Sequence, residues 1–381
     1  MRILFVQPFG VGGPGGGPRV LRTLIRASSV DALSICTSPE APPRTELVEE
    51  RHVRSRPAVG RLEHTRLAPG LGALDVPAQR GLARTLRRTA VQWGAQAVHC
   101  TAHALDFWAG LRVAHDLQLP YLLGVHDDLR YALRGSPVRR LALRRLGNAW
   151  RVADARFVIT RQLGSEYCTR YGERPFTVLT DGLESIATRA PSPRESTLHV
   201  YFMGAYHTSY RENFDALLSA LAQLRAARPG RTVSLTWRGG GLPFAHASDV
   251  PMEVRGFAPD ETPQREAGDA DLLYLPLPFG AAHRDFVRFS LSTKLVTYLG
   301  TGRPILYHGP KEAAAARLLS EHDAAIVVDS PRPEALVAGI ERGLERAATI
   351  GANALALARA EFSVRQVRDR FLSGLDGLAS A

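Results

Sequence analysis

The chain has 381 residues, more than the roughly 250–300 at which a single hydrophobic core stops growing, so two domains are expected. Hydrophobic residues make up 45% and charged residues 22%, a globular composition that excludes disordered and collagen-like chains. The net charge is +11, but Lys294 and Lys311 are the only lysines among 48 basic residues. Such an arginine bias is typical of a GC-rich genome, so the charge alone does not indicate a nucleic-acid partner, and none is expected.

No apolar run approaches the ~20 residues of a membrane-spanning helix. The apolar stretch at residues 3–6 is too short for a secretory signal before Gln7 and Pro8 interrupt it. We therefore expect a cytoplasmic protein, soluble or peripherally attached to the inner face of a membrane. Cys36, Cys100 and Cys168 are far apart in the sequence, which disfavours a disulfide framework and a metal site.

Short apolar runs alternate with longer amphipathic stretches, a pattern typical of βα units and parallel sheets. The first half predicts strands at 3–6, 32–36, 97–100, 121–125, 155–159 and 177–179, and helices at 19–28, 81–94, 105–117, 138–149 and 162–171. Two prolines without an apolar anchor interrupt the pattern at 189–194. Strands then follow at 198–203, 233–237, 253–255, 272–275, 304–307 and 325–328, with helices at 213–225, 294–299, 313–320, 333–346 and 364–378.

This order predicts an α/β protein with two facing, Rossmann-like, doubly wound domains and a cleft between them. The expected divisions are an N-terminal domain at 1–188, a linker at 189–196, a C-terminal domain at 197–360, and a helix at 361–381 that packs back on the first domain. Ligands of such sheets bind at the carboxyl ends of the strands.

Two loops in the first half follow predicted strands. Residues 10–19 read GVGGPGGGPR and open a helix, so their backbone N–H groups can approach an anion or a sugar. Residues 124–128 read GVHDD, where His126 can donate a hydrogen bond to a ligand. Adjacent carboxylates at a strand end point in different directions, so no metal is expected at Asp127. The alternatives are that residues 10–19 form a flexible surface turn and that residues 124–128 only cap the segment that follows them.

In the second half, Gly204, Arg211 and Arg238 lie where strands pass into helices or loops. Arg211 combines a guanidinium with a helix N-terminus, which suits a diphosphate. The most informative segment, residues 289–307, reads FSLSTKLVTYLGTGRPILY. There Ser292 and Thr293 lead into a helix that carries Lys294, and together they form an anion cradle.

The segment at 289–307 resembles the donor-nucleotide motif of retaining, family-4-like glycosyltransferases of the GT-B fold, a Ser-x-x-Lys helix followed by Tyr-Leu-Ala-x-Gly-x-Pro. The glycine-rich loop, His126-Asp127, the VLTDG at 178–182 and the VRGF at 254–257 agree with that family in the same order. The resemblance implies a bacterial hexosyltransferase-like enzyme of polysaccharide biosynthesis. It would move a sugar from a nucleoside diphosphate sugar to a glycan, lipid-linked or small-molecule acceptor, with retention and without a metal or other cofactor.

By this resemblance, the domain at 1–188 is the acceptor side, the domain at 197–360 binds the nucleotide-sugar donor, and each candidate residue receives a role. His126, Arg211 and Lys294 are expected to be catalytic, and the acceptor or sugar side to be formed by Gly12, Gly13, Gly15, Gly16, Gly17 and Asp127. Donor binding is assigned to Gly204, Arg211, Arg238, Gly256, Phe257, Ser292, Thr293, Lys294 and Thr297.

Three positions depart from the family pattern. Ala205 stands where the family often has an arginine after the glycine at 204. Phe289 and Thr297 stand where the family usually has glutamates, the second of which binds the ribose. A non-catalytic sugar- or nucleotide-binding partner subunit therefore stays an alternative, and a nucleotide-sugar epimerase is a further one. Separately, the basic segments 80–88 and 134–145 are a candidate contact with an anionic membrane surface, the alternative being ordinary solvated helices.

Overall fold

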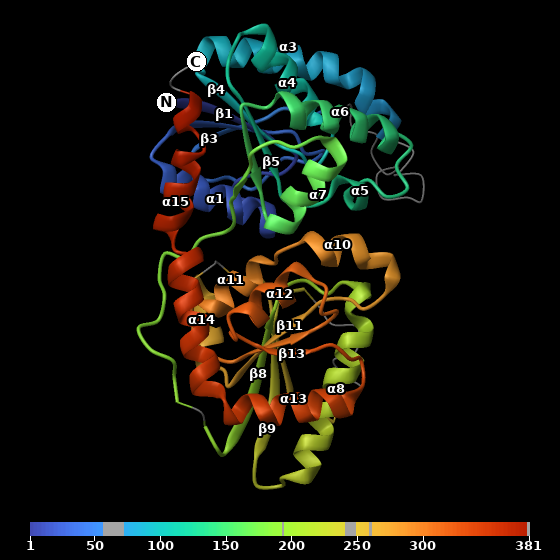
Figure 1. The fold of residues 1–381 in the computed structure, drawn as a ribbon, viewed down its shortest axis with the longest axis vertical. Helices are drawn as coiled ribbons and strands as arrows, with labels where there is room; N and C mark the ends of the chain where they lie inside the picture. The colour runs from blue at the N-terminus through green and yellow to red at the C-terminus, as the bar shows by residue number, and fades with distance from the viewer. Residues whose placement is uncertain (56–71, 193, 241–248, 259–260, 379–381) are drawn as a thin grey trace. The chain divides into compact units, whose positions relative to one another are not determined.

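The computed structural model describes residues 1–55, 72–192, 194–240, 249–258 and 261–378. Contacts divide the chain into two units (Figure 1). The N-terminal unit is Met1–Gly182 together with Val364–Ala381, and the C-terminal unit is Leu183–Ser363. Each unit contains one wholly parallel sheet with helices packed against it, which confirms the α/β class and the two Rossmann-like domains.

The sheet of the N-terminal unit has the strand order β3-β2-β1-β4-β5-β6-β7. Its strands are β1 (Arg2–Gln7), β2 (Asp31–Cys36), β3 (Glu49–His52), β4 (Ala97–Thr101), β5 (Tyr121–Val125), β6 (Ala155–Val158) and β7 (Thr177–Val178). The helices are α1 (Gly16–Ser28), α3 (Asp75–Trp93), α4 (Asp106–Asp116), α5 (Leu129–Ala132), α6 (Arg139–Val152), α7 (Arg161–Tyr171) and α15 (Val364–Ser373). The central strands β4, β5 and β6 are buried along their whole length, as expected for a parallel sheet covered on both faces.

The sheet of the C-terminal unit has the order β10-β9-β8-β11-β12-β13. Its strands are β8 (Thr197–Met203), β9 (Thr232–Arg238), β10 (Met252–Arg255), β11 (Leu272–Pro276), β12 (Ile305–His308) and β13 (Ile326–Val328). The helices are α8 (Arg211–Ala227), α9 (Glu261–Asp269), α10 (Arg284–Phe289), α11 (Thr293–Leu299), α12 (Ala314–Glu321), α13 (Pro333–Glu345) and α14 (Ala347–Glu361). In both sheets the strand order reverses beside the first strand, at β1–β4 and at β8–β11, where doubly wound folds bind ligands.

The last helix of the chain belongs to the N-terminal unit. On α15, Val367 and Phe371 are buried in the core cluster that also contains Leu21 and Leu24 of α1. The ring of Phe371 lies 5.1 Å from that of Phe157 in β6. The unit's core is therefore completed by residues that are more than 200 positions away from β6 in the sequence.

The segment expected as a linker at 189–196 lies inside the C-terminal unit, and its Pro193 is outside the described residues. Around it, Arg359 donates hydrogen bonds to the carbonyls of Ala187 and Thr188, and Arg194 pairs with the buried Asp271 at 2.6 Å. Arginine contacts of this kind leave no hydrophobic signal in the sequence, so the proline-rich composition could not predict them.

Helix packing in the C-terminal unit depends on a close approach of two glycines. A Cβ at Gly351, in the middle of α14, would overlap the carbonyl oxygen of Gly302. Gly302 itself has a φ of 69°, in the left-handed region that favours glycine. The loop before β12 and helix α14 can therefore touch only because position 351 has no side chain.

Replacing Gly351 with alanine should lower the free energy of unfolding by about 1–3 kcal/mol, because backbone atoms must move to admit the Cβ. Gly268→Ala is a matched control in helix α9 of the same unit, where a Cβ meets nothing within 4 Å. The control should be neutral or stabilising by up to about 1 kcal/mol. Urea unfolding followed by circular dichroism measures both values, and equal effects of the two substitutions would contradict the packing argument.

Candidate functional site

The carboxyl ends of β8 and β9 meet at two glycines. Gly204 follows β8 with a φ of 132°, and its N–H donates to the carbonyl of Arg238 at 2.7 Å. Gly239 follows β9 with a φ of 150°, and a Cβ there would overlap the Gly204 carbonyl. The two strand ends therefore bring their backbones into contact at the edge where a parallel sheet binds ligands.

Lys294 lies against this pair of strand ends. A Cβ at Gly204 would be 3.1 Å from the Lys294 ammonium, which lies 5.4 Å from the ring centroid of Phe202 and 5.9 Å from that of Tyr210. Helix α11 positions the lysine in its first turn, after Ser292 caps the helix by accepting a hydrogen bond from the Lys294 N–H at 3.3 Å. The ammonium is thus held between a glycine backbone and two aromatic faces.

The Lys294 ammonium has no carboxylate partner and no hydrogen bond among the residues that the structure describes. Burial lowers its pKa from 10.5 to about 8, so the side chain still carries its charge at pH 7. A partly buried cation without a counter-ion is unfavourable until an anion binds beside it. The site is therefore suited to a phosphate or carboxylate ligand, and cation–π contacts with Phe202 and Tyr210 stabilise the cation meanwhile.

The other predicted residues of this helix have different positions. Ser292 and Thr293 are partly exposed at the start of α11. Thr297 is fully buried, and its hydroxyl donates to the Thr293 carbonyl at 3.3 Å. Phe289 is also buried, in α10, with the Arg288 guanidinium 4.9 Å from its ring. Phe289 and Thr297, which stand where the family has glutamates, are thus both part of the hydrophobic packing of the unit.

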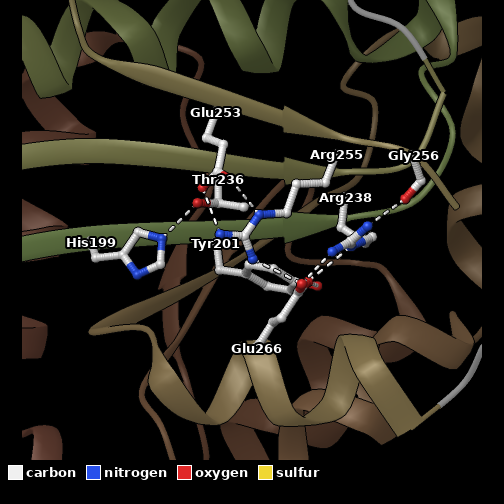
Figure 2. Close-up of polar contacts among 8 residues, drawn as sticks. All are labelled: His199, Tyr201, Thr236, Arg238, Glu253, Arg255, Gly256 and Glu266. Atoms are coloured by element: carbon white, nitrogen blue, oxygen red, sulfur yellow. Dashed lines mark hydrogen bonds and ion pairs between the residues drawn. The ribbon is translucent and has the colours of Figure 1, made fainter. Parts of the chain in front are cut away.

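A carboxylate on α9 gathers the basic side chains of β9 and β10 (Figure 2). Glu266 accepts from Arg238 Nε at 2.9 Å, from Arg255 Nη1 at 2.8 Å and from the Tyr201 hydroxyl at 3.0 Å. Arg238 also donates to the Gly256 carbonyl at 2.7 Å. The charge of Arg238, predicted for donor binding, is therefore already compensated, and its visible role is to tie the ends of β9 and β10 to α9.

Gly256 and Phe257 follow β10. Gly256 has an open position, where a Cβ would meet nothing within 4 Å, and its carbonyl is the acceptor for Arg238. The Phe257 side chain is 65% exposed, and its ring edge is 3.7 Å from the Cβ position of Gly240. An exposed aromatic ring beside a glycine backbone offers a flat apolar surface to a planar ligand.

Arg211 begins α8, immediately after the Tyr210 that contacts Lys294. Its side chain is 77% exposed and lies 3.7 Å from Asp215, one helical turn later. Arg211 lines an open pocket of about 590 Å³. The pocket is also lined by residues at 208–212, 280–283 and 331–333: Thr208, Ser209, Glu212, Gly280, His283, Pro331 and Pro333. The guanidinium is therefore accessible, with a neighbouring carboxylate that competes for its charge.

The glycine-rich loop of the N-terminal unit is held by other parts of its own unit. Arg22 donates to the carbonyls of Val11 and Gly13, and Glu50 accepts the Val11 N–H at 2.8 Å. A Cβ at Gly12 would approach the carbonyl of Pro43 at 2.6 Å. Of the remaining predicted glycines, Gly15 has a φ of 101° with open space around it, Gly16 begins α1, and Gly17 packs against the Phe9 ring.

His126 and Asp127 follow β5 at the carboxyl edge of the first sheet. The His126 ring is stacked with Phe9 at 6.3 Å, and the Asp127 carboxylate lies 3.9 Å from Nδ1 of His103. Sequence reasoning missed His103, although it follows β4 as His126 follows β5, and this shared position was the available signal. The structure therefore brings together His126, Asp127, His103 and Phe9 at one edge of the N-terminal sheet.

Among the described residues, no group of three or more His, Cys, Asp or Glu side chains could hold a metal ion. Likewise, none of the described helices is both long enough and apolar enough to span a lipid bilayer.

Glu266→Gln should lower the free energy of unfolding by about 1.5–3 kcal/mol, because it removes the charged acceptor of two arginines. Burial alone would raise the pKa of Glu266, but hydrogen bonds from Arg238, Arg255 and Tyr201 outweigh it and lower the pKa to about 2. The stabilisation is therefore present above the ordinary pKa of 4.5 and is lost as pH falls from there toward 2. Unfolding measured between pH 7 and pH 3 should show the difference between wild type and mutant shrink. Glu345→Gln, at the exposed end of α13, serves as the control, and a difference that does not depend on pH would argue against the ion pairs.

Comparisons with known proteins agree with this architecture. Residues 14–184 match the family model described as Glycosyltransferase Family 4. Similar structures include HepE from Anabaena solved with UDP, at 18% identity, TM-score 0.68 and 100% of both chains covered. Another is sucrose-phosphate synthase from Thermosynechococcus elongatus, at 13% identity, TM-score 0.72 and coverage of 100% of this chain and 99% of that one. A third is a trehalose-6-phosphate structure from E. coli bound with UDP-2-fluoro glucose, at 13% identity, TM-score 0.67 and coverage of 98% and 99%.

None of the curated proteins matches the chain. The structural likenesses are below 25% identity and show the fold, while the family model supplies the sequence evidence for the N-terminal unit. Together they confirm the resemblance drawn from the motifs. The whole chain therefore has the fold of these GT-B structures, and residues 14–184 carry the sequence pattern of Glycosyltransferase Family 4.

Proposed function

We propose that this protein transfers a sugar from a nucleoside diphosphate sugar to an acceptor, and that its C-terminal unit binds the donor. The observation that carries this proposal is the uncompensated ammonium of Lys294 beside the Gly204 backbone. A diphosphate supplies the missing negative charge. Because HepE has been solved with UDP and with UDP-glucose, uridine diphosphate sugars are the first donors to test.

The transfer reaction makes negative charge grow on the leaving diphosphate as the glycosidic bond breaks. A cation that is already in position stabilises this charge more in the transition state than in the ground state. Lys294 fills this role in our proposal, with the exposed Arg211 as a second cation and Ser292 and Thr293 as hydrogen-bond donors. Phe257 would face the nucleotide base, with Gly256 beside it.

We assign the sugar and acceptor side to the N-terminal unit. His126 would donate a hydrogen bond to the sugar or to the oxygen at the reacting bond, because it lies at the carboxyl edge of the sheet. Gly12, Gly13, Gly15, Gly16, Gly17 and Asp127 would contact the acceptor, for which we propose a glycan, a lipid-linked sugar or a small molecule. Retention of configuration and independence from metals are parts of the same proposal.

A non-catalytic, nucleotide-binding partner subunit is the second candidate. It is favoured by Thr297, whose hydroxyl is turned into its own helix and so offers no carboxylate to a ribose. The two candidates differ in one measurement. A transferase hydrolyses the sugar nucleotide slowly in the absence of acceptor, and a binding subunit stabilises on nucleotide addition without any turnover.

Lys294→Ala should abolish the thermal stabilisation that a nucleoside diphosphate gives to the protein, because the mutant lacks the buried cation. Lys311→Ala is the matched control, since Lys311 is the other lysine of the chain and is exposed, 3.6 Å from Asp329. A thermal-shift series of diphosphates and sugar diphosphates checks both variants. If no nucleotide stabilises the wild type, or if Lys294→Ala responds as strongly as Lys311→Ala, the donor site is elsewhere.

We further propose that basic helices of the N-terminal unit hold the enzyme on anionic membranes. On α3, Arg80, Arg84, Arg87 and Arg88 are all exposed, as are Arg134, Arg140, Arg144 and Arg145 in and before α6. Leu146 is buried, and Leu141 and Leu143 are partly buried, so an inserted apolar face is not supported on α6. The attraction would therefore be electrostatic.

Exchanging Arg140 and Arg144 for glutamate should reduce binding to vesicles that contain anionic lipid by at least tenfold at low salt, because about 1 kcal/mol per basic residue is lost. Exchange of the exposed Arg225 and Arg228 of the C-terminal unit changes net charge equally and provides the control. Co-sedimentation measures the effect. Equal binding to anionic and neutral vesicles would remove the proposal.

A further inference from the structure

Three polar side chains interrupt the apolar face of the N-terminal sheet that packs against α1. His99 and Thr101 are two residues apart on β4, so their side chains point to the same face. Thr101 is paired in register with Gly124 of β5, and His126 follows two residues later. All four residues line a small cavity whose other walls are apolar: Val20, Leu21, Leu24, Phe157 and Leu179.

Each of the three side chains carries a polar atom without a partner. Nδ1 of His99, Oγ1 of Thr101 and Nδ1 of His126 are buried and make no hydrogen bond to any described residue. Buried polar atoms in native structures almost always have a partner, because leaving one unpaired costs free energy. Three such atoms around one cavity need a shared explanation.

The cavity has the size of a single water molecule. Its volume for a water-sized sphere is about 10 Å³, the space that one internal water needs. Gly124 helps to create this arrangement, because a Cβ there would lie 3.0 Å from Cε1 and 3.1 Å from Nε2 of His99. A side chain at position 124 would push the His99 ring out of its place.

We propose that this cavity binds one internal water that links His99, Thr101 and His126 and thereby orients the His126 imidazole. The water accepts a hydrogen bond from the Thr101 hydroxyl and donates one to each of the two Nδ1 atoms. Its two donors and one of its two acceptor positions are thus used, and all three buried atoms gain a partner.

The arrangement requires both imidazoles to be neutral and protonated at Nε2. Burial lowers the pKa of His99 to about 4 and that of His126 to about 3, from 6.5, and the neighbouring His103 and His99 lower the latter further. His126 as a whole is partly exposed where it follows β5, whereas its Nδ1 is buried in the cavity. With Nδ1 accepting from the water, the proton on Nε2 is available to donate to a ligand oxygen at that edge.

Thr101 is therefore a positioning residue for His126, and this consequence rests on the proposed function, whereas the water site does not. Thr101→Val keeps the shape of the side chain and removes the hydroxyl. Thr101→Ser keeps the hydroxyl and should behave as the wild type. Thr169→Val, on the exposed face of α7, is a control for the substitution itself.

Two measurements test the proposal without needing activity. In the wild type, oxygen-17 magnetic relaxation dispersion should detect a long-lived internal water that disappears in Thr101→Val. Nitrogen-15 spectra of the histidine side chains should show His126 protonated at Nε2 in the wild type and Thr101→Ser, with a mixed tautomer in Thr101→Val. A wild-type crystal structure with a dry cavity, or a His126 tautomer that Thr101→Val leaves unchanged, would overturn it.

A third measurement adds the link to catalysis. Thr101→Val should lower kcat about tenfold and leave the KM for the donor unchanged, while Thr101→Ser restores kcat. Unchanged kcat in Thr101→Val would overturn the positioning role. Failure of the proposed function looks different, because nucleotides would then give no thermal shift to any variant while the water and tautomer signals remain.

Discussion

The contact between two backbones at Gly204 and Gly239 is the constraint on which the donor site depends. Because neither residue has a side chain, the ends of β8 and β9 come together, and the Lys294 ammonium lies beside them. An alanine at either position would meet a carbonyl, or the lysine itself, in a backbone conformation that L-residues rarely adopt. The arrangement of charge at the edge of this sheet thus follows from the absence of two side chains.

Charge compensation separates the cations of this unit into two kinds. Arg238 and Arg255 share Glu266, so their charges stabilise the fold and bind together β9, β10 and α9 (Figure 2). Lys294 faces aromatic rings and no carboxylate among the described residues, so its charge is available. A cation of the second kind has more to gain from a phosphate, because no carboxylate competes for its charge.

The periodicity of the sequence was sufficient to predict every central strand and the pairing of two α/β halves, because parallel strands buried on both faces are continuous apolar runs. Lys294 was also predictable, since its helix carries a capping serine and ends at glycines. The ion pair of Arg238 was not predictable, because its partner Glu266 is 28 residues away and a sequence does not show which carboxylate a guanidinium will contact. The inward orientation of Thr297 was not predictable either, because packing around α11 decides it. The same holds for the polar cavity at His99, whose lining residues come from five segments of the chain.

The position of α15 has a consequence for how the protein is made. A ribosome delivers the whole C-terminal unit before it delivers Val367 and Phe371, which complete the core of the N-terminal unit. The first unit to be synthesised is therefore finished only after the second, and until α15 is made the apolar side chains of Leu21, Leu24 and Phe157 lack its cover. A truncation that removes α15, by a premature stop codon or by a protease, would therefore damage the N-terminal unit, although the cut lies after the C-terminal unit in the sequence.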